Sequence, residues 1–203
     1  MRAVKFVNEL VTPSKVVCVG RNYAAHIAEL NNETPTSMVL FIKPNSALSD
    51  TLCATHGAEQ LHYETELCFL VKDKQLAGVG LGLDLTKRRL QSNLKERGLP
   101  WERAKAFNGA ALFSDFVPCN DTKHYQFSLL IDGKPAQYGD TQLMLHNAEK
   151  ILSEISEFMD LEDGDIIMTG TPEGVGEVES GSTFQVLLMD EQTEVLSHQW
   201  LAV

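Results

Sequence analysis

The chain has 203 residues, 43% of them hydrophobic and 22% charged, and its formal net charge is −11. This length and composition predict one globular domain over residues 1–203, with enough apolar residues for a sizeable core. The negative charge, the lack of a basic run and the lack of a long apolar run exclude nucleic acid and membrane as expected partners.

Three apolar runs in the N-terminal part predict short strands, at residues 3–7, 15–20 and 38–43. The segment 20–30 indicates a strand end that opens into a short helix capped by Asn22. On that helix His26 and Glu29 share one face and can form a hydrogen bond. A carboxylate that orients a histidine is typical of a general base, although an ordinary surface pair has the same spacing. Lys43 closes the third run, either as a surface lysine or as an anion-binding group.

The stretch 61–71 alternates with a period of two and predicts a strand on which Glu64 and Glu66 project side by side. The apolar residues that follow carry this strand into a core. Two carboxylates at the rim of a core repel each other and resist desolvation, and a hard divalent cation would neutralise them. The alternative is an edge strand with a solvated acidic face.

A second strand is predicted at residues 76–86, with Asp84 where it ends. Its glycines at 78, 80 and 82 leave one face bare for a close neighbour. They do not form G-x-G-x-x-G, because position 83 is Leu, so a dinucleotide site is excluded. If Asp84 converges with Glu64 and Glu66, a ligand set of oxygens alone favours Mg²⁺, Mn²⁺ or Ca²⁺ over Zn²⁺.

The rest of the chain continues the alternation of short elements. Helices are expected at 87–97, with Thr86 as cap, and at 142–158, and strands at 110–117, 126–131, 134–138, 166–168, 183–189 and 194–200. Strands outnumber helices and often adjoin through turns, which predicts an α+β domain with a largely antiparallel or mixed sheet. The cysteines, at 18, 53, 68 and 119, are widely spaced, so reduced thiols and a cytoplasmic protein are expected.

Six segments in register resemble the fumarylacetoacetate hydrolase family, over about residues 15–176. They are GRNYAAHIAE, FIKP, HYETEL, LDLTKRRLQ, GLPWERAKAF and GDIIMTGTPEGVG. The resemblance implies a compact rolled mixed β-sheet, commonly in a homodimer. The short chain and the tryptophan-to-lysine segment are most similar to acylpyruvase-type members, which act on acylpyruvates and oxaloacetate.

The resemblance also assigns roles to residues of this chain. It implies metal ligands for Mg²⁺ or Mn²⁺ at Glu64, Glu66 and Asp84. It implies that His26 and Glu29 are a water-activating pair and that Lys105 lies near the metal. It implies four substrate contacts, at Arg21, Lys43, Gln91 and Thr171. The chain departs from the family pattern at Leu83, Arg89 and Asn108, which leaves the substrate open.

The function that follows is metal-dependent hydrolysis of a carbon–carbon bond in an acylpyruvate such as acetylpyruvate or fumarylpyruvate. Two enzymatic alternatives remain open, since they use the same enolate chemistry. One is an oxaloacetate decarboxylase or keto–enol tautomerase, and the other is a hydratase or isomerase of 2-oxo dienoates. A third alternative, from another class, is a metal-stabilised binding protein without catalysis.

Overall fold

Two β-sheets form the framework of the protein, whose computed structural model describes residues 1–30, 33, 35–119 and 124–203. The larger sheet has the order β10–β9–β8–β14–β3–β4, and β11 also pairs with β9. Its strands are β10 (Ala111–Phe113), β9 (Gln75–Asp84), β8 (Thr65–Lys72), β14 (Ile166–Met168), β3 (Lys15–Gly20), β4 (Val39–Pro44) and β11 (Val117–Pro118). Only β14 and β3 run parallel, so the sheet is mixed, as the sequence predicted.

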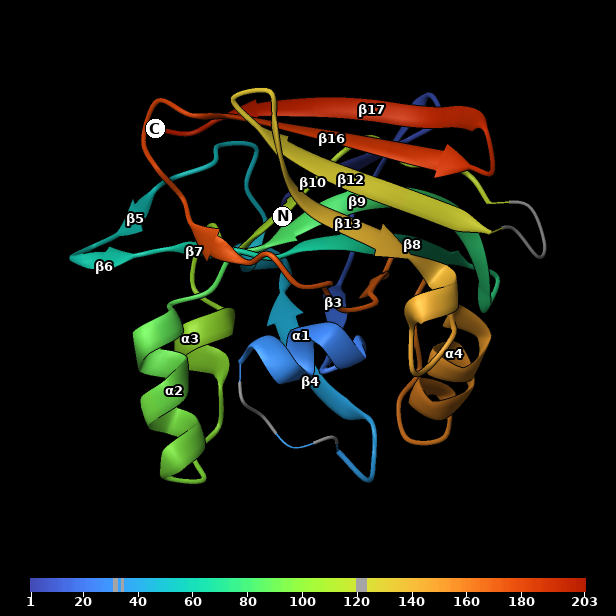
Figure 1. Ribbon diagram of the computed structural model, residues 1–203. Helices are drawn as coiled ribbons and strands as arrows, with labels where there is room; N and C mark the ends of the chain where they lie inside the picture. The colour runs from blue at the N-terminus through green and yellow to red at the C-terminus, as the bar shows by residue number, and fades with distance from the viewer. Residues whose placement is uncertain (31–32, 34, 120–123) are drawn as a thin grey trace.

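The second sheet is antiparallel and has the order β13–β12–β16–β17. Its strands are Lys134–Asp140, Tyr125–Ile131, Thr183–Asp190 and Thr193–Leu201, so both predicted hairpins are present. Three small pairs complete the strands: β1 (Val4–Phe6) with β2 (Glu9–Val11), β5 (Thr55–His56) with β6 (Glu59–Gln60), and β7 (His62–Tyr63) with β15 (Gly176–Glu177). Figure 1 shows the four-stranded sheet lying across β8 and β9.

The main core lies between the two sheets. Leu67 and Leu81 contribute to it from the larger sheet, and Phe127 and Phe184 from the smaller one, all of them buried. On the other face of β9, a Cβ at Gly82 would lie 2.9 Å from the carbonyl oxygen of Leu112, so a side chain there would collide with β10. This close approach agrees with the bare face that the glycine period predicted.

Helices cover the side of the larger sheet that faces away from the four-stranded sheet (Figure 1). They are α1 (Ala24–Glu29), α2 (Arg88–Glu96), α3 (Glu102–Lys105) and α4 (Ala148–Ser156), with single 3₁₀ turns at Asn45–Ala47 and Thr141–Leu143. Ile151 and Ile155 of α4 pack on Val17 and Val19 of β3. None of the helices in the described part of the chain is long and apolar enough to cross a membrane.

The prediction of one helix over 142–158 is wrong for its first six residues, 142–147. The helix begins only after Asn147, whose side-chain oxygen accepts a hydrogen bond of 2.9 Å from the backbone N–H of Lys150. The preceding segment is held elsewhere, because the backbone N–H of Leu145 donates to the carbonyl oxygen of Asn22. Helical spacing of apolar residues continued across this stretch, but the cap and the long-range bond determine where α4 starts.

Asn22 does not cap α1, contrary to the prediction. The capping position is Tyr23, and its side chain makes no capping bond. The buried Asn22 amide instead donates to the carbonyl oxygens of Thr169, at 2.8 Å, and His146, at 2.9 Å. It therefore ties the start of α1 to the end of β14.

Candidate active site

Three carboxylates converge where β8 and β9 pair. Glu64 lies between β7 and β8, Glu66 is the second residue of β8, and Asp84 ends β9. The backbone N–H of Asp84 donates to the carbonyl oxygen of Glu64, at 2.8 Å, which sets the register of the two strands at this point. One oxygen from each carboxylate lies within 4.8 Å of the others, and all three side chains are buried. The edge-strand alternative with a solvated acidic face is therefore wrong.

Cations from three other elements surround this cluster. Lys105 of α3 places its Nζ 2.8 Å from both Glu64 Oε2 and Asp84 Oδ2. Lys43 of β4 places its Nζ 2.8 Å from Asp84 Oδ1 and is fully buried, so it is not a surface lysine. Arg88, at the start of α2, contacts Glu64. Glu64 and Asp84 thus have cationic partners before any metal ion is considered.

The acids of the cluster differ in their electrostatic surroundings. Burial raises the pKa of Glu64, but the nearby charges of Lys105 and Arg88 outweigh it and hold that pKa well below its usual value. Burial raises the pKa of Glu66 well above its usual value, and the charges of Asp84 and Glu64 add to the effect. The backbone N–H of Gly170, which donates to the Glu66 carboxylate at 2.7 Å, and the charge of Lys105 lower this pKa but do not outweigh those effects.

The donor set fits a hard divalent cation. All three ligand candidates are carboxylates, which suit Mg²⁺, Mn²⁺ or Ca²⁺. Asp84 Oδ1 is buried and, among the described residues, has no hydrogen bond, although the Lys43 ammonium lies beside it. A cation would also neutralise Glu66, whose charge has no cationic side chain in contact within the described chain.

His26 and Glu29 form a hydrogen-bonded pair on α1. His26 Nδ1 lies 3.0 Å from Glu29 Oε2, and the other carboxylate oxygen of Glu29 accepts a bond of 2.9 Å from the backbone N–H of Gly174. Glu29 therefore links α1 to the loop after β14. With Nδ1 held in this way, Nε2 is the ring nitrogen left to exchange a proton.

A small cavity of about 30 Å³ joins this pair to the carboxylates. Most of the residues predicted for the site line it: Arg21, His26, Glu64, Glu66, Asp84, Gln91, Lys105 and Thr171. Lys43 and Glu29 do not line it, and each acts on the site through a neighbour. Gln91 accepts a bond from Arg88, and Thr171 donates its hydroxyl to the carbonyl oxygen of Thr65.

Sequence reasoning missed some of the residues that organise the site. Thr86, predicted as a helix cap, instead turns its hydroxyl toward Lys105 Nζ, at 2.5 Å. Gln137 of β13 accepts a bond of 2.9 Å from the backbone N–H of Thr65, and its amide donates to Thr171 Oγ1 at 2.8 Å. The position of Arg88, three residues before Gln91, could have been noticed, whereas nothing local to Gln137 indicates its role.

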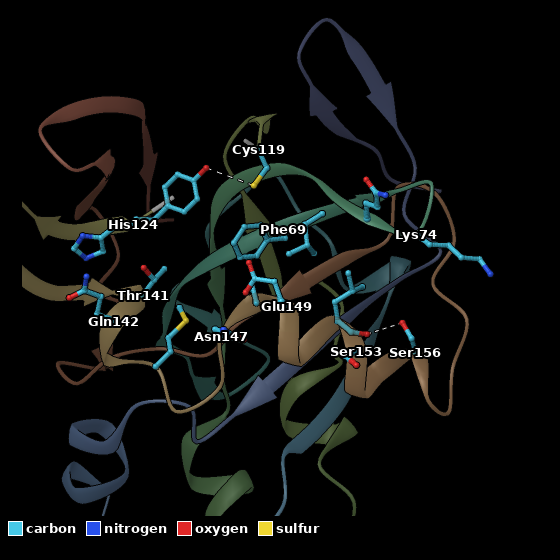
Figure 2. Close-up of a pocket in the computed structure, with 16 residues that line it drawn as sticks. Phe69, Lys74, Cys119, His124, Thr141, Gln142, Asn147, Glu149, Ser153 and Ser156 are labelled. Carbon is cyan, nitrogen blue, oxygen red and sulfur yellow. Dashed lines mark hydrogen bonds between the residues drawn. The ribbon is translucent and has the colours of Figure 1, made fainter. Parts of the chain in front are cut away.

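A larger pocket, of about 860 Å³, lies elsewhere, against α4 and β12 (Figure 2). It shares no lining residue with the cavity at the carboxylates. Figure 2 shows Lys74 pointing away from it and Phe69 at its wall. The carboxylate cluster is the one group of three or more potential metal ligands in the described chain. We therefore take the smaller cavity, which the carboxylates line, as the candidate active site, and not the larger pocket.

Comparison with known proteins agrees with this architecture. The sequence model described as fumarylacetoacetate (FAA) hydrolase C-terminal matches residues 15–198. The chain is 39% identical to the oxaloacetate tautomerase YcgM of Escherichia coli (strain K12), over 85% of this chain and 87% of that protein. It is 37% identical to the mitochondrial oxaloacetate tautomerase oaa1 of Schizosaccharomyces pombe, over 89% of this chain and 90% of that protein.

A solved structure shares the whole fold. The fumarylpyruvate hydrolase from Pseudomonas aeruginosa, in complex with Mn²⁺ and pyruvate, superposes with a TM-score of 0.87 at 29% identity. The similarity covers 100% of this chain and 97% of that one. The chain belongs to the fumarylacetoacetate hydrolase family of enzymes.

Proposed function

We propose that this protein is a divalent-metal-dependent oxaloacetate tautomerase, which interconverts the keto and enol forms of oxaloacetate. The similarity to two named oxaloacetate tautomerases over most of the chain supports this substrate. The observation that supports the mechanism is that the oriented His26 and the carboxylate cluster line the same cavity. A base facing a bound 2-oxo acid is the arrangement that proton transfer beside a carbonyl requires.

Glu64, Glu66 and Asp84 would hold the cation, Mg²⁺ or Mn²⁺. Such a cation would supply Lewis-acid stabilisation of the negative charge that develops on the 2-oxo oxygen of the substrate. The chain's own cations remain beside it. Burial alone would lower the pKa of Lys105, but Asp84 and Glu64 raise it, so its ammonium stays protonated.

The proton transfers then have defined donors and acceptors. In the keto form, His26 Nε2 takes a proton from carbon 3, while Glu29 holds the ring through Nδ1. The electron pair of that C–H bond forms the double bond between carbons 2 and 3, and the Lys105 ammonium stabilises the negative charge that develops on the 2-oxo oxygen. That oxygen then takes up a proton from water and His26 releases its proton to water, which returns the enzyme to its starting state. Ketonisation is the reverse sequence. Arg21, Gln91 and Thr171 line the cavity and would bind the substrate's carboxylates.

A second candidate is hydrolysis of an acylpyruvate, favoured by the similarity to the fumarylpyruvate hydrolase. Here His26 would take a proton from a water molecule whose oxygen attacks the distal carbonyl carbon. Cleavage of the carbon–carbon bond would give a carboxylic acid and the enolate of pyruvate, which is then protonated. The same groups would serve both reactions: His26 takes its proton from carbon 3 in tautomerisation and from water in hydrolysis, and only hydrolysis breaks a carbon–carbon bond.

The test is the rate at which the enol of oxaloacetate disappears with Mg²⁺ present, followed by ultraviolet absorption. We expect acceleration over Mg²⁺ alone, and a loss of about 10²–10⁴-fold in His26→Gln. His198→Gln, at a histidine that packs on Trp200 outside the cavity, is the matched control and should keep the wild-type rate. If acetylpyruvate or fumarylpyruvate is cleaved to two products while enol decay is not accelerated, the hydrolase assignment replaces the tautomerase.

A further inference from the structure

One face of α2 runs outward from the carboxylate cluster. Arg88, Gln91 and Lys95 are spaced three and four residues apart, so they lie on the same side of the helix. All three line the cavity of the candidate site. Arg88 contacts Glu64 at the inner end, and Lys95 lies about 10 Å further along the helix axis, from the rise of seven residues.

Lys95 reaches the cavity along an aromatic wall. Its Nζ lies 5.2 Å from the centre of the Trp101 ring, and the Trp101 and Phe41 rings are 5.8 Å apart. Both aromatic residues also line the cavity. In the part of the chain that the structure describes, no carboxylate lies within ion-pair distance of Lys95 Nζ. Within the described residues, the ammonium group of Lys95 therefore lies over an aromatic ring and has no carboxylate partner.

The surroundings of this ammonium group are positive. Burial lowers the pKa of Lys95 to about 8, and the charges of Arg21 and Arg88 are the next causes. Of these two, Arg88 contacts the Glu64 carboxylate, and Arg21, whose guanidinium donates to the carbonyl oxygen of Glu33, lines the same cavity as Lys95. An anion placed between Arg21 and Lys95 would relieve the repulsion between them.

We propose that Lys95, with Arg21 beside it, binds the distal carboxylate of a 2-oxo dicarboxylic acid and makes the site select dianions over monoanionic 2-oxo acids. This inference rests on the proposed function, which places the 2-oxo acid end of the substrate at the carboxylate cluster. The other end then points along α2. Oxaloacetate and fumarylpyruvate carry a second carboxylate, and acetylpyruvate does not.

Two ordinary roles of Lys95 must be separated from this one. It lies in the last turn of α2, where a cation is favourable, and it packs on an aromatic ring. Lys87 offers a matched control at the other end of the helix, because its Nζ lies 4.9 Å from the Phe107 ring centre and it does not line the cavity. Replacing either lysine with methionine keeps the aliphatic stem on the ring and removes one charge.

The experiment compares binding of L-malate and L-lactate to the Mg²⁺-loaded protein by calorimetry. The two ligands share a 2-hydroxy acid end and differ by the distal carboxylate. In Lys95→Met we expect malate binding to weaken about 10- to 100-fold, as for the loss of a charge-assisted bond, and lactate binding to change by no more than about twofold. Lys95→Arg should keep most of the malate affinity, and Lys87→Met should match the wild type.

Equal weakening of malate and lactate, or unchanged malate binding, would overturn the proposal. Lys95→Gln repeats the test if the methionine variant does not fold. The proposed function can fail separately. Selective, Lys95-dependent malate binding in a protein without tautomerase activity would keep the subsite and reject the tautomerase. Tautomerase activity together with malate binding that does not depend on Lys95 would keep the tautomerase and reject the subsite.

Discussion

Replacing Glu66 with glutamine should destroy metal binding and yet stabilise the metal-free protein. Glu66 is buried beside Asp84 and Glu64 and is the member of the cluster whose pKa is raised, by burial first and then by those two charges. Glutamine has nearly the same shape, can still accept the N–H of Gly170, and carries no charge. A divalent cation, by contrast, would lose one of its three carboxylate ligands.

The size of the stabilisation follows from the protonation of this carboxyl. Its ordinary pKa is 4.5, and each pH unit by which the folded state raises that pKa costs about 1.4 kcal/mol at a pH above both values, so the cost at pH 7 has an upper limit of about 3 kcal/mol. Because the pKa is raised in the folded state, stability falls as the pH rises from the ordinary pKa toward the folded one. The glutamine variant should therefore gain about 1–3 kcal/mol at pH 7, or about 2–10 °C in Tm, and nothing near pH 4.

The assay is thermal unfolding at pH 7, first in EDTA and then with Mg²⁺. The wild type should gain about 4.1 kcal/mol at a thousand times its Kd for Mg²⁺, which exceeds the advantage of the variant, and Glu66→Gln should gain almost nothing. The order of the two Tm values should therefore invert on adding Mg²⁺. Glu177→Gln, at an exposed carboxylate outside the cavity, is the control and should follow the wild type. A metal-free Glu66→Gln less stable than the wild type, or equally stabilised by Mg²⁺, would refute the reasoning.

Two further variants test long-range contacts, one beside the site and one at the opposite end of β3 and β14. Gln137→Met should lose about 2–4 kcal/mol in urea unfolding, since it leaves the buried N–H of Thr65 without an acceptor, and a loss below about 1 kcal/mol would contradict this role. Asp165→Ala should lose about 3–5 kcal/mol in the same assay. The fully buried Asp165 accepts hydrogen bonds from the backbone N–H groups of Ser14 and Lys15 and from Lys15 Nζ, and alanine would leave these donors without an acceptor. Wild-type stability of the variant would show that these groups find other partners.

The carboxylate cluster could be predicted from sequence because its geometry is local. A strand period of two places Glu64 and Glu66 on one face whatever the rest of the fold. Asp84 follows from the next strand, since consecutive strands of this kind usually pair. The His26–Glu29 contact is likewise a matter of helical spacing. Each of these signals lies within one element or between neighbours in the chain.

The features that sequence reasoning missed depend on contacts between distant segments. Gln137 joins a strand of the second sheet to Thr65 and Thr171, which lie 72 and 34 residues away. The start of α4 was misplaced for the same reason, because the bond from Leu145 to Asn22 overrides the helical spacing of the segment.

The charges of the site also constrain its substrate. Glu64, Glu66 and Asp84 contribute three negative charges when ionised, and Lys43, Arg88 and Lys105 contribute three positive ones, so the cluster alone is neutral. A divalent cation would leave two positive charges in a buried place, where an uncompensated charge is costly. A dianion restores neutrality and a monoanion does not. This balance favours dicarboxylic 2-oxo acids independently of Lys95, which lies outside the cluster and would then serve to fix the distal carboxylate in position.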